Sequence, residues 1–135
     1  MKKLMIVLLV TLSVKSFSQQ VQRFSLTNVL DGKAVSQGDY ASNAAIVIIF
    51  AVNACAFDDY YIDRIKALSA QYQNKVPVLL VNADQDGGES AENMVKRAQL
   101  KGITIPYLAD KDQSLMRSLN ARKSVEAFLL KNTCT

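Results

Sequence analysis

Two short apolar runs separated by an amphipathic segment constrain the fold of this chain more than any other feature. Residues 45–52 read AIVIIFAV and residues 76–81 read VPVLLV. Runs of this length that are rich in β-branched residues are typical of strands covered on both faces of a sheet. Pro77 is compatible with a strand because it lies near the start of the second run. Both runs are therefore predicted to be central strands.

The segment between these strands has the spacing of an α-helix. Apolar side chains recur at intervals of four, four, three and four residues, which predicts one shared, buried face: Phe57, Tyr61, Ile65, Leu68 and Tyr72. Two buried strands joined by a helix form a βαβ unit, with parallel strands and a right-handed crossover.

The remaining elements complete an α/β pattern. Residues 24–35 alternate apolar and polar side chains around Asp31-Gly32, which predicts a β-hairpin. Ser90 is expected to cap a helix that ends near Gly102, with four side chains turned inward: Ala91, Met94, Val95 and Ala98. A short extended piece at 105–108, a helix at 112–119 (Leu115, Met116 and Leu119 on one side) and a last strand at 127–130 follow. The prediction is a mixed or largely parallel sheet flanked by helices.

Residues 1–18 are typical of a secretory signal peptide. Lys2 and Lys3 precede the apolar stretch Leu4–Val14, and small residues in Ser16-Phe17-Ser18 suit cleavage before Gln19. The apolar stretch is well short of the ~20 residues that span a membrane, so no membrane association is expected after cleavage. We therefore expect export to the periplasm or the extracellular space and a single mature domain over residues 19–135.

Composition and charge exclude several classes of function. Cleavage removes three of the 16 basic residues and none of the 12 acidic ones, which leaves a net charge of +1 and no basic stripe for nucleic acid. The absence of histidine excludes Ser-His-Asp and Cys-His catalysis. Two cysteines are too few for a zinc cluster or a disulfide framework. The loop with Asp84, Asp86 and Glu89 does not follow calcium-binding spacing and is predicted to be solvated; no metal or cofactor is expected.

Cys55 is the residue placed best for chemistry. It lies three residues after Val52, at the start of the predicted helix, and the C-terminal ends of sheet strands are where reactive groups collect. The amides and dipole of a helix N-terminus stabilise a thiolate. Asp58 and Asp59, in the same first turn, oppose this effect, and no nearby lysine in the sequence compensates. Spacing alone thus leaves open a reactive thiol or a small packing residue.

Several segments in a collinear order resemble the redoxins of the thioredoxin-like superfamily, the alkyl hydroperoxide reductase/thiol-specific antioxidant group, and especially a branch with the active-site pattern F-x-x-N-x-C-P-F. They span about Phe24 to Leu130: Ile49–Phe57, Tyr61–Ile65, Val78–Asn82, Ile105–Asp110 with Gln113, and Leu119–Ala121 to Glu126–Leu130. The resemblance implies a thioredoxin-like fold in which Cys55 is the attacking thiol, flanked by Asn53, Ala56 and Phe57.

The sequence departs from the patterns of these proteins in four features. Ala56 replaces the usual proline, and Asp58 stands where a second cysteine would complete a Cys-x-x-Cys pair. Ile48 and Val52 replace residues of the peroxiredoxin motif, including the hydroxyl that holds peroxide. Val125, after Ser124, stands where the fold places a cis-proline beside the substrate groove. Since a non-proline cis bond costs ~3–4 kcal/mol, we expect a trans peptide there and an altered groove.

The resemblance also implies a further strand and helix after Leu130. Without them the last strand lies at an uncovered sheet edge, so we expect either an incomplete domain or an edge covered by a second chain. That strand would place Cys134 about 30 Å from Cys55, too far for a disulfide. Cys134 is then an incidental thiol or an intermolecular link.

Two functions follow from these observations. The first is an exported redoxin, a thiol-dependent oxidoreductase or antioxidant whose Cys55 attacks a disulfide or peroxide and is reduced by an external thiol or thioredoxin-like reductant. Arg64 or Arg122 would be the candidate support for a thiolate or an anionic substrate. The second is a catalytically inactive redoxin-fold domain that binds a protein segment or has a structural role.

Overall fold

The computed structural model describes residues 23–132 and contains one six-stranded mixed sheet. The strand order across the sheet is β2-β1-β5-β4-β3-β6. The strands are β1 (Ser25–Asn28), β2 (Ala34–Ser36), β3 (Ala45–Phe50), β4 (Val78–Asn82), β5 (Tyr107–Ala109) and β6 (Ala127–Lys131). The predicted signal segment, residues 1–18, lies outside the described residues.

The predicted βαβ unit is confirmed. β3 and β4 are parallel neighbours, with Val47 opposite Val78 and Phe50 opposite Val81, and α1 (Ala56–Tyr72) connects them. β5 extends the sheet in parallel to β4, whereas β6 is antiparallel to β3. β4 is buried along its whole length, as expected for a central strand covered on both faces.

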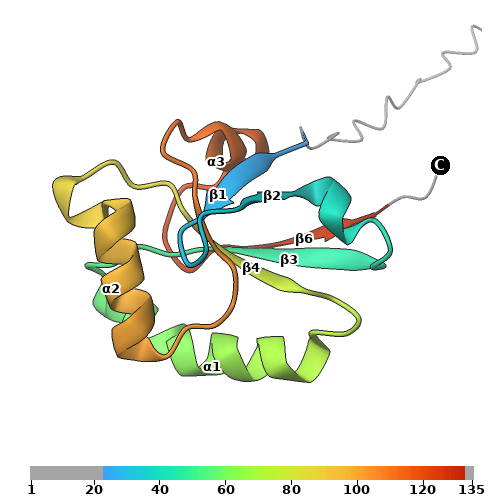
Figure 1. Ribbon diagram of the computed structural model, residues 1–135, viewed down its shortest axis with the longest axis horizontal. Coiled ribbons are helices and arrows are strands. Elements are labelled where there is room, and N and C mark those ends of the chain that lie inside the picture. The colour runs from blue at the N-terminus through green and yellow to red at the C-terminus, as the bar shows by residue number, and fades with distance from the viewer. Residues whose placement is uncertain (1–22, 133–135) are drawn as a thin grey trace, which may run out of the picture.

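The helices form layers on the two faces of the sheet (Figure 1). α1 and α2 (Ala91–Lys101) lie on one face, and α3 (Ser114–Leu119) lies on the other. Ile62, Ile65 and Met94 pack with the sheet on the first face, and Leu115 and Leu119 pack on the second. Two apolar clusters separated by the sheet form the core.

Local signals in the sequence explain where several elements begin and end. The Ser90 side chain accepts a hydrogen bond from the Asn93 amide at 3.2 Å, and Gly102 ends α2 with a φ of 61°. Both observations confirm the predicted caps. The hairpin of β1 and β2 is also confirmed, with Gly32 at a positive φ of 71° in its turn.

The predicted buried face of the first helix is wrong in part. Ile65 is buried, but Phe57 is 72% exposed, Tyr72 is 42% exposed and Leu68 is 38% exposed. The buried side of α1 instead carries Asp58, Ile62 and Ile65. The sheet contacts this side because hydrogen bonds fix Asp58 in the interior, and the apolar stripe lies on a flank of α1.

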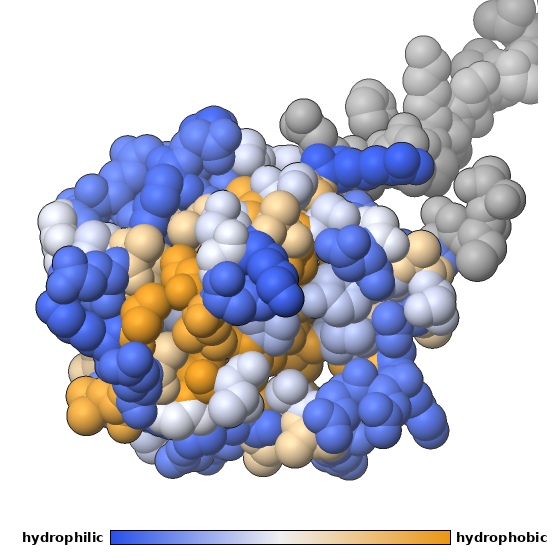
Figure 2. All heavy atoms as spheres, viewed as in Figure 1, coloured by the Kyte–Doolittle hydropathy of each residue, from blue (hydrophilic) through white to orange (hydrophobic). Residues whose placement is uncertain are grey.

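α2 shows a similar departure. Met94 and Ala98 are buried as predicted, while Ala91 is exposed and the charged Arg97 is only 6% exposed. In the space-filling view, apolar side chains gather between α2 and the β1–β2 hairpin and are framed by polar ones (Figure 2). Val29 and Leu30, in the hairpin turn, pack against the apolar cluster of this face. No helix within residues 23–132 has the length and apolarity needed to cross a membrane.

Candidate functional site

Cys55 lies at the junction between β3 and α1, as the sequence predicts. It is the N-cap residue of α1, with φ −103° and ψ 120°, and its carbonyl accepts hydrogen bonds from the amides of Asp58 and Asp59. The side chain is half-buried and forms no disulfide. Its neighbours Ala56 and Phe57 are exposed, so reagents in solvent can approach this end of the helix.

Asp58 is a buried bridge between three segments. Its side chain is 2% exposed. The Val52 amide donates to its Oδ2 at 2.5 Å, and the Ser124 hydroxyl lies 2.6 and 2.5 Å from its two carboxylate oxygens. The carboxylate thus joins the loop before Cys55, the first turn of α1 and the segment before β6. We expected Asp58 to compete with Cys55 for the positive end of the helix. That expectation is incomplete, because the Asp58 carboxylate also accepts hydrogen bonds from the Val52 amide and the Ser124 hydroxyl.

Glu89 is a second buried carboxylate beneath the Cys55 loop. It is 3% exposed and accepts hydrogen bonds from the amide of Asn53 at 2.6 Å and from that of Ala54 at 3.1 Å. The Asn82 side chain also donates to it at 2.7 Å. The prediction that this loop is solvated is therefore wrong for Glu89: a short 3₁₀ turn, Gly87–Glu89, directs the side chain inward.

A lysine adds positive charge next to Glu89. Lys111 Nζ donates to Asn82 Oδ1 at 3.0 Å and to the Asp84 carbonyl at 2.7 Å. Burial lowers the pKa of Lys111, while the negative charges of Glu89, Asp84 and Asp110 act in the opposite direction. The end of β4 is thus anchored by a connected set of charged and amide groups.

Asn53 links the loop to a buried tyrosine and arginine. The Tyr107 hydroxyl donates to Asn53 Oδ1 at 3.2 Å, and Arg97 Nη1 donates to the same hydroxyl at 3.4 Å. Burial raises the pKa of Tyr107. Asn53, predicted only as a flanking residue, thereby orients the loop through its side chain and its amide.

Asp59 is paired with cations that sequence proximity does not reveal. Lys101 Nζ lies 2.9 Å from its Oδ2, and Arg97 Nη2 lies 3.3 Å from its Oδ1. The hydrogen bond from Lys101 is the main cause of the lowered pKa of Asp59. No lysine close in the sequence offsets the acidic first turn, but α2 supplies two basic groups in the folded chain, Lys101 and Arg97.

The two arginines considered from the sequence lie in different places. Arg64 stacks over Tyr60 and Tyr61, with its guanidinium carbon 5.2 and 5.6 Å from the ring centroids. It therefore packs on the exposed surface of α1. Arg122 lines a cavity next to the site.

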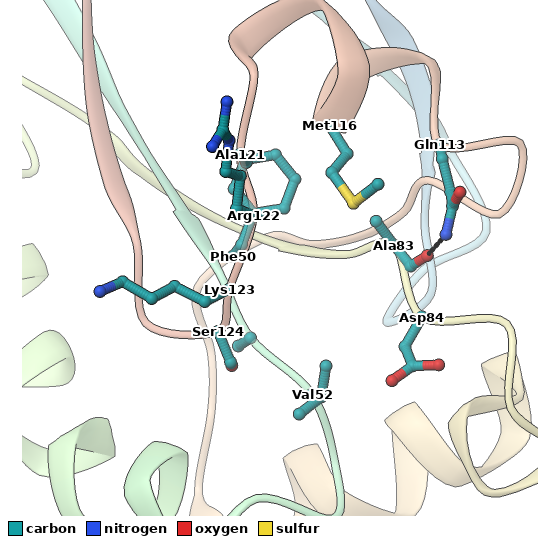
Figure 3. A pocket seen from close by; sticks show the side chains of 11 residues that line it. Phe50, Val52, Ala83, Asp84, Gln113, Met116, Ala121, Arg122, Lys123 and Ser124 are labelled. Carbon is teal, nitrogen blue, oxygen red and sulfur yellow. Dashed lines mark hydrogen bonds between the residues drawn. The ribbon is translucent and has the colours of Figure 1, made fainter.

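This cavity has a volume of about 270 Å³ and lies at the C-terminal ends of β3 and β4. Phe50, Met116 and Ala83 form apolar walls, and Gln113 donates to the Ala83 carbonyl at 3.0 Å (Figure 3). Val52 and Ser124 line the side that leads to Asp58, whereas the Lys123 side chain extends away from the other lining groups. Cys55 does not line the cavity, so the groups connecting the two are Val52, Ser124 and Asp58.

Val125 has the trans peptide bond that its sequence position predicts, since residues 23–132 contain no cis peptide. Its φ is +58°, a conformation uncommon for a β-branched residue. Its amide donates to the Phe50 carbonyl at 2.8 Å. Hydrogen bonding to β3 thus holds the backbone at the position that the resemblance assigns to a cis-proline, and the side chain does not line the cavity.

These groups limit the chemistry of the site. Only one cysteine lies in the described residues, so a local dithiol cannot form there. Ile48 is buried in the core and offers no hydrogen bond. The amide of Val52 is occupied by Asp58. What remains is one half-buried cysteine on a loop held by two buried carboxylates.

Comparisons with known proteins agree with this geometry. The model of the AhpC/TSA family matches residues 17–134. No curated protein matches the chain. Among solved structures, an uncharacterized conserved protein from Geobacillus kaustophilus is 32% identical, with a TM-score of 0.78, over 84% of this chain and 62% of that one.

Two more distant structures share the fold. A thiol-disulfide oxidoreductase from Bacteroides fragilis is 16% identical, with a TM-score of 0.70, over 85% of each chain. A secreted Mycobacterium tuberculosis disulfide oxidoreductase is 14% identical, with a TM-score of 0.68, over 83% of this chain and 78% of that one. The chain spans 62% and 63% of the length of the first two structures it matches.

Proposed function

Since the chain belongs to the AhpC/TSA family, we propose that it is an exported thiol–disulfide oxidoreductase that acts through the single thiol of Cys55. The observation that carries this proposal is the placement of Cys55 as the half-buried N-cap of α1. Amides at a helix N-terminus favour an anion, and a thiolate is the nucleophilic form of cysteine.

The reaction we propose is a two-step exchange with an external disulfide. The Cys55 thiolate attacks one sulfur of the substrate, which breaks the substrate S–S bond and forms a mixed disulfide with Cys55. The other sulfur leaves as a thiolate and takes up a proton. A thiolate from an external thiol or a thioredoxin-like reductant then attacks the substrate sulfur of the mixed disulfide, which releases the Cys55 thiolate and joins the reductant to the substrate. A second thiol of the reductant breaks that bond, so that two external thiols are oxidised to a disulfide and both sulfurs of the substrate leave as thiols.

A disulfide suits these residues better than a peroxide. In the peroxiredoxin motif a hydroxyl holds the peroxide, and the residue at that position here is Val52. Its side chain cannot donate a hydrogen bond. The cavity of about 270 Å³, with apolar walls from Phe50 and Met116, is suited to an apolar side chain of a peptide substrate.

Export is part of the proposal because the pattern of residues 1–18 supports it. An extracytoplasmic location would expose Cys55 to disulfides, which persist outside the reducing cytosol. It would also require a source of thiols outside the cytosol.

The test is the alkylation of Cys55 in the native protein, followed by exchange with a model disulfide. In a Cys134→Ser background, which leaves Cys55 as the one cysteine, we expect the native protein to react with iodoacetamide at neutral pH. We also expect Cys134→Ser to form one mixed disulfide with a dithiobenzoate reagent, and the matched double variant with Cys55→Ser and Cys134→Ser to form none. Alkylation of Cys55 only after unfolding contradicts the proposal.

One observation favours a non-catalytic binding domain as the second candidate. Asp58 occupies the place of a second cysteine and forms hydrogen bonds with Val52 and Ser124. A site held together in this way can present the cavity to a peptide without redox chemistry. In that case Cys55→Ser would leave peptide binding intact and no mixed disulfide would accumulate.

A further inference from the structure

The cavity beside the Cys55 loop has the size of one large side chain. Its volume is about 270 Å³. This exceeds the volume of an engineered cavity of roughly 150 Å³ that binds benzene, and it is below the range of about 300–1,000 Å³ for pockets that hold whole small molecules. Ala83 and Ala121 line the cavity and are buried against the same apolar cluster. A larger side chain at either position would fill the space.

The apolar walls of this cavity favour an aromatic ring. The Phe50 ring is held edge-on to Phe128, with 5.8 Å between the ring centroids. Phe50 and the thioether side chain of Met116 both line the cavity (Figure 3). Aromatic rings pair favourably with other rings and with a thioether sulfur. An aromatic side chain in the cavity therefore gains contacts that an aliphatic side chain lacks.

The neutral polar groups of the walls are already hydrogen-bonded within the protein. The Gln113 side chain donates to the Ala83 carbonyl at 3.0 Å, and the Ser124 hydroxyl donates to Asp58 at 2.6 Å. A polar group of a ligand would find few free partners here and would be costly to bury. Charged residues at the cavity are half-buried or exposed, so their charged groups can stay in water when it is filled: Asp84, Arg122 and Lys123.

The backbone around the cavity adopts uncommon conformations. Among residues 23–132, the non-glycine residues with a positive φ are Gln113 at 58°, Asn120 at 54° and Val125 at 58°. Gln113 lines the cavity, and the other two are next in the chain to Ala121 and Ser124, which also line it. Residues in sparsely populated conformations cluster at ligand sites, where the rest of the fold maintains them. This observation is independent of the wall chemistry and also indicates a binding site.

The cavity lies within reach of a peptide whose disulfide is attacked by Cys55. Val52 lines the cavity, and the chain between Val52 and Cys55 holds their Cα atoms at most about 11 Å apart. An extended substrate strand covers about 10 Å in three residues. A side chain about three residues from the substrate cysteine can thus enter the cavity while the two sulfurs meet.

We propose that the cavity is a specificity pocket for one large aromatic side chain, tryptophan above all, about three residues from the cysteine of a substrate disulfide. The inference rests on the proposed function for the disulfide and on the cavity for the aromatic residue. Ala83 and Ala121 are then specificity-determining residues, because their small side chains leave room for the ring.

Peptide disulfides test this preference in the full chain with Cys134→Ser. The substrates are symmetric disulfides of one short peptide, with tryptophan, leucine or alanine at both positions three residues from its cysteine. Cys55 attacks one sulfur, forms a mixed disulfide with one peptide and releases the other as a thiol; mass spectrometry measures the rate. At low peptide concentration the tryptophan peptide should react at least about tenfold faster than the alanine peptide. It should react about two- to tenfold faster than the leucine peptide.

Filling the cavity should abolish this preference. Ala83→Leu and, independently, Ala121→Leu should bring the rates of the three peptides within about twofold of one another. Ala91→Leu is a matched change on the exposed surface of α2 and should keep the full preference. Equal rates for the three peptides without a cavity substitution, or a preference that survives in both cavity variants, overturns the proposal.

Indole binding separates the pocket from the redox function. In protein labelled with ¹³C at the methionine methyl groups, indole should shift the Met116 resonance and leave that of Met94, which is buried on the opposite face of the sheet, unchanged. If Cys55 forms no mixed disulfide with any of the peptides, the proposed function fails, and the indole titration alone decides whether the cavity takes an aromatic ring. A Met116 resonance that does not move up to the solubility limit of indole overturns the inference.

Discussion

The clearest perturbation of the site is the removal of the Glu89 carboxylate. This side chain is 3% exposed and accepts three hydrogen bonds, from the amides of Asn53 and Ala54 and from the side chain of Asn82. Glu89→Ala removes every acceptor at once. Glu89→Gln keeps one oxygen and turns an amino group toward the remaining donors.

The magnitude follows from the surroundings of each donor. Asn82 is fully buried, and an unpaired buried donor costs about 1–3 kcal/mol. The amides of Asn53 and Ala54 lie closer to solvent, so water replaces part of the loss, at about 0.5–1.5 kcal/mol each. We expect Glu89→Ala to lower the free energy of unfolding by about 3 kcal/mol and Glu89→Gln to lower it by about 1–2 kcal/mol.

Urea unfolding at neutral pH, followed by circular dichroism, measures both values. With a slope of about 1.5 kcal/mol per molar urea, Glu89→Ala should lower the midpoint by about 2 M. Glu92→Gln is the matched control, because Glu92 is exposed and paired only with Lys96 on the surface of α2; no measurable change is expected. If Glu89→Ala behaves like this control, the carboxylate does not anchor the Cys55 loop.

Two further predictions concern charge and backbone. The lowered pKa of Asp59, caused mainly by the hydrogen bond from Lys101, means that the folded state favours the ionised carboxylate. This contribution is present above the unfolded pKa of about 3.9 and is lost as the pH falls through the lower folded value. Asp59→Asn should therefore destabilise the protein at neutral pH and match the wild type in strong acid; an equal loss at both pH values in urea titrations would contradict the pairing. Val125→Gly should leave the free energy of unfolding unchanged or raise it by up to about 1 kcal/mol, since glycine accepts a φ of +58°. Val125→Pro should lower it, because proline lacks the amide N–H that donates to the Phe50 carbonyl. Thermal unfolding that ranks the proline variant above the glycine variant would refute this.

The sequence was sufficient for the architecture because local signals and global packing agree. The apolar runs at 45–52 and 76–81 contain the parallel strands β3 and β4. Ser90 and Gly102 mark the ends of α2. The orientation of α1 was the exception: hydrophobic periodicity places an apolar stripe on one side, and the buried Asp58 turns the helix away from it. The spacing of hydrophobic residues cannot reveal a polar residue that is buried because its hydrogen bonds are satisfied inside the protein.

The sequence predicted only the part of the site that is formed by residues close together in the chain. Cys55 was found because a strand end and a helix start are adjacent in the sequence. Glu89 was missed because the two backbone amides that it binds are 35 and 36 residues away, and a carboxylate beside two glycines is typical of a solvated loop. Arg97 was missed for the same reason, as its contacts with Asp59 and Tyr107 link separate elements. The one available signal was that Arg97 follows Met94 by three residues and therefore lies on the same side of the helix.

Substitutions of Asp58 can separate its contribution to the stability of the protein from its effect on the redox chemistry of Cys55. Its position relative to Cys55 is that of the second thiol in a Cys-x-x-Cys pair, and both residues lie in the first turn of α1. Residues three apart in a helix have Cβ atoms about 5–6 Å apart, so a small local adjustment permits a disulfide.

Asp58→Cys is therefore expected to form an intramolecular disulfide with Cys55. It should also lose stability, because the Val52 amide and the Ser124 hydroxyl lose their acceptor, at about 2–4 kcal/mol in the reduced state. Asp58→Ser, which loses the same carboxylate without adding a thiol, is the control for that loss. Mass spectrometry after oxidation should show a loss of two hydrogens in Asp58→Cys alone, and insulin reduction should then proceed without an accumulated mixed disulfide. If the oxidised variant instead remains a mixed disulfide with the external thiol, the Cys55 sulfur points away from residue 58. In that case position 58 is not equivalent to that of a second, resolving cysteine, and the Asp58 carboxylate has a structural role only.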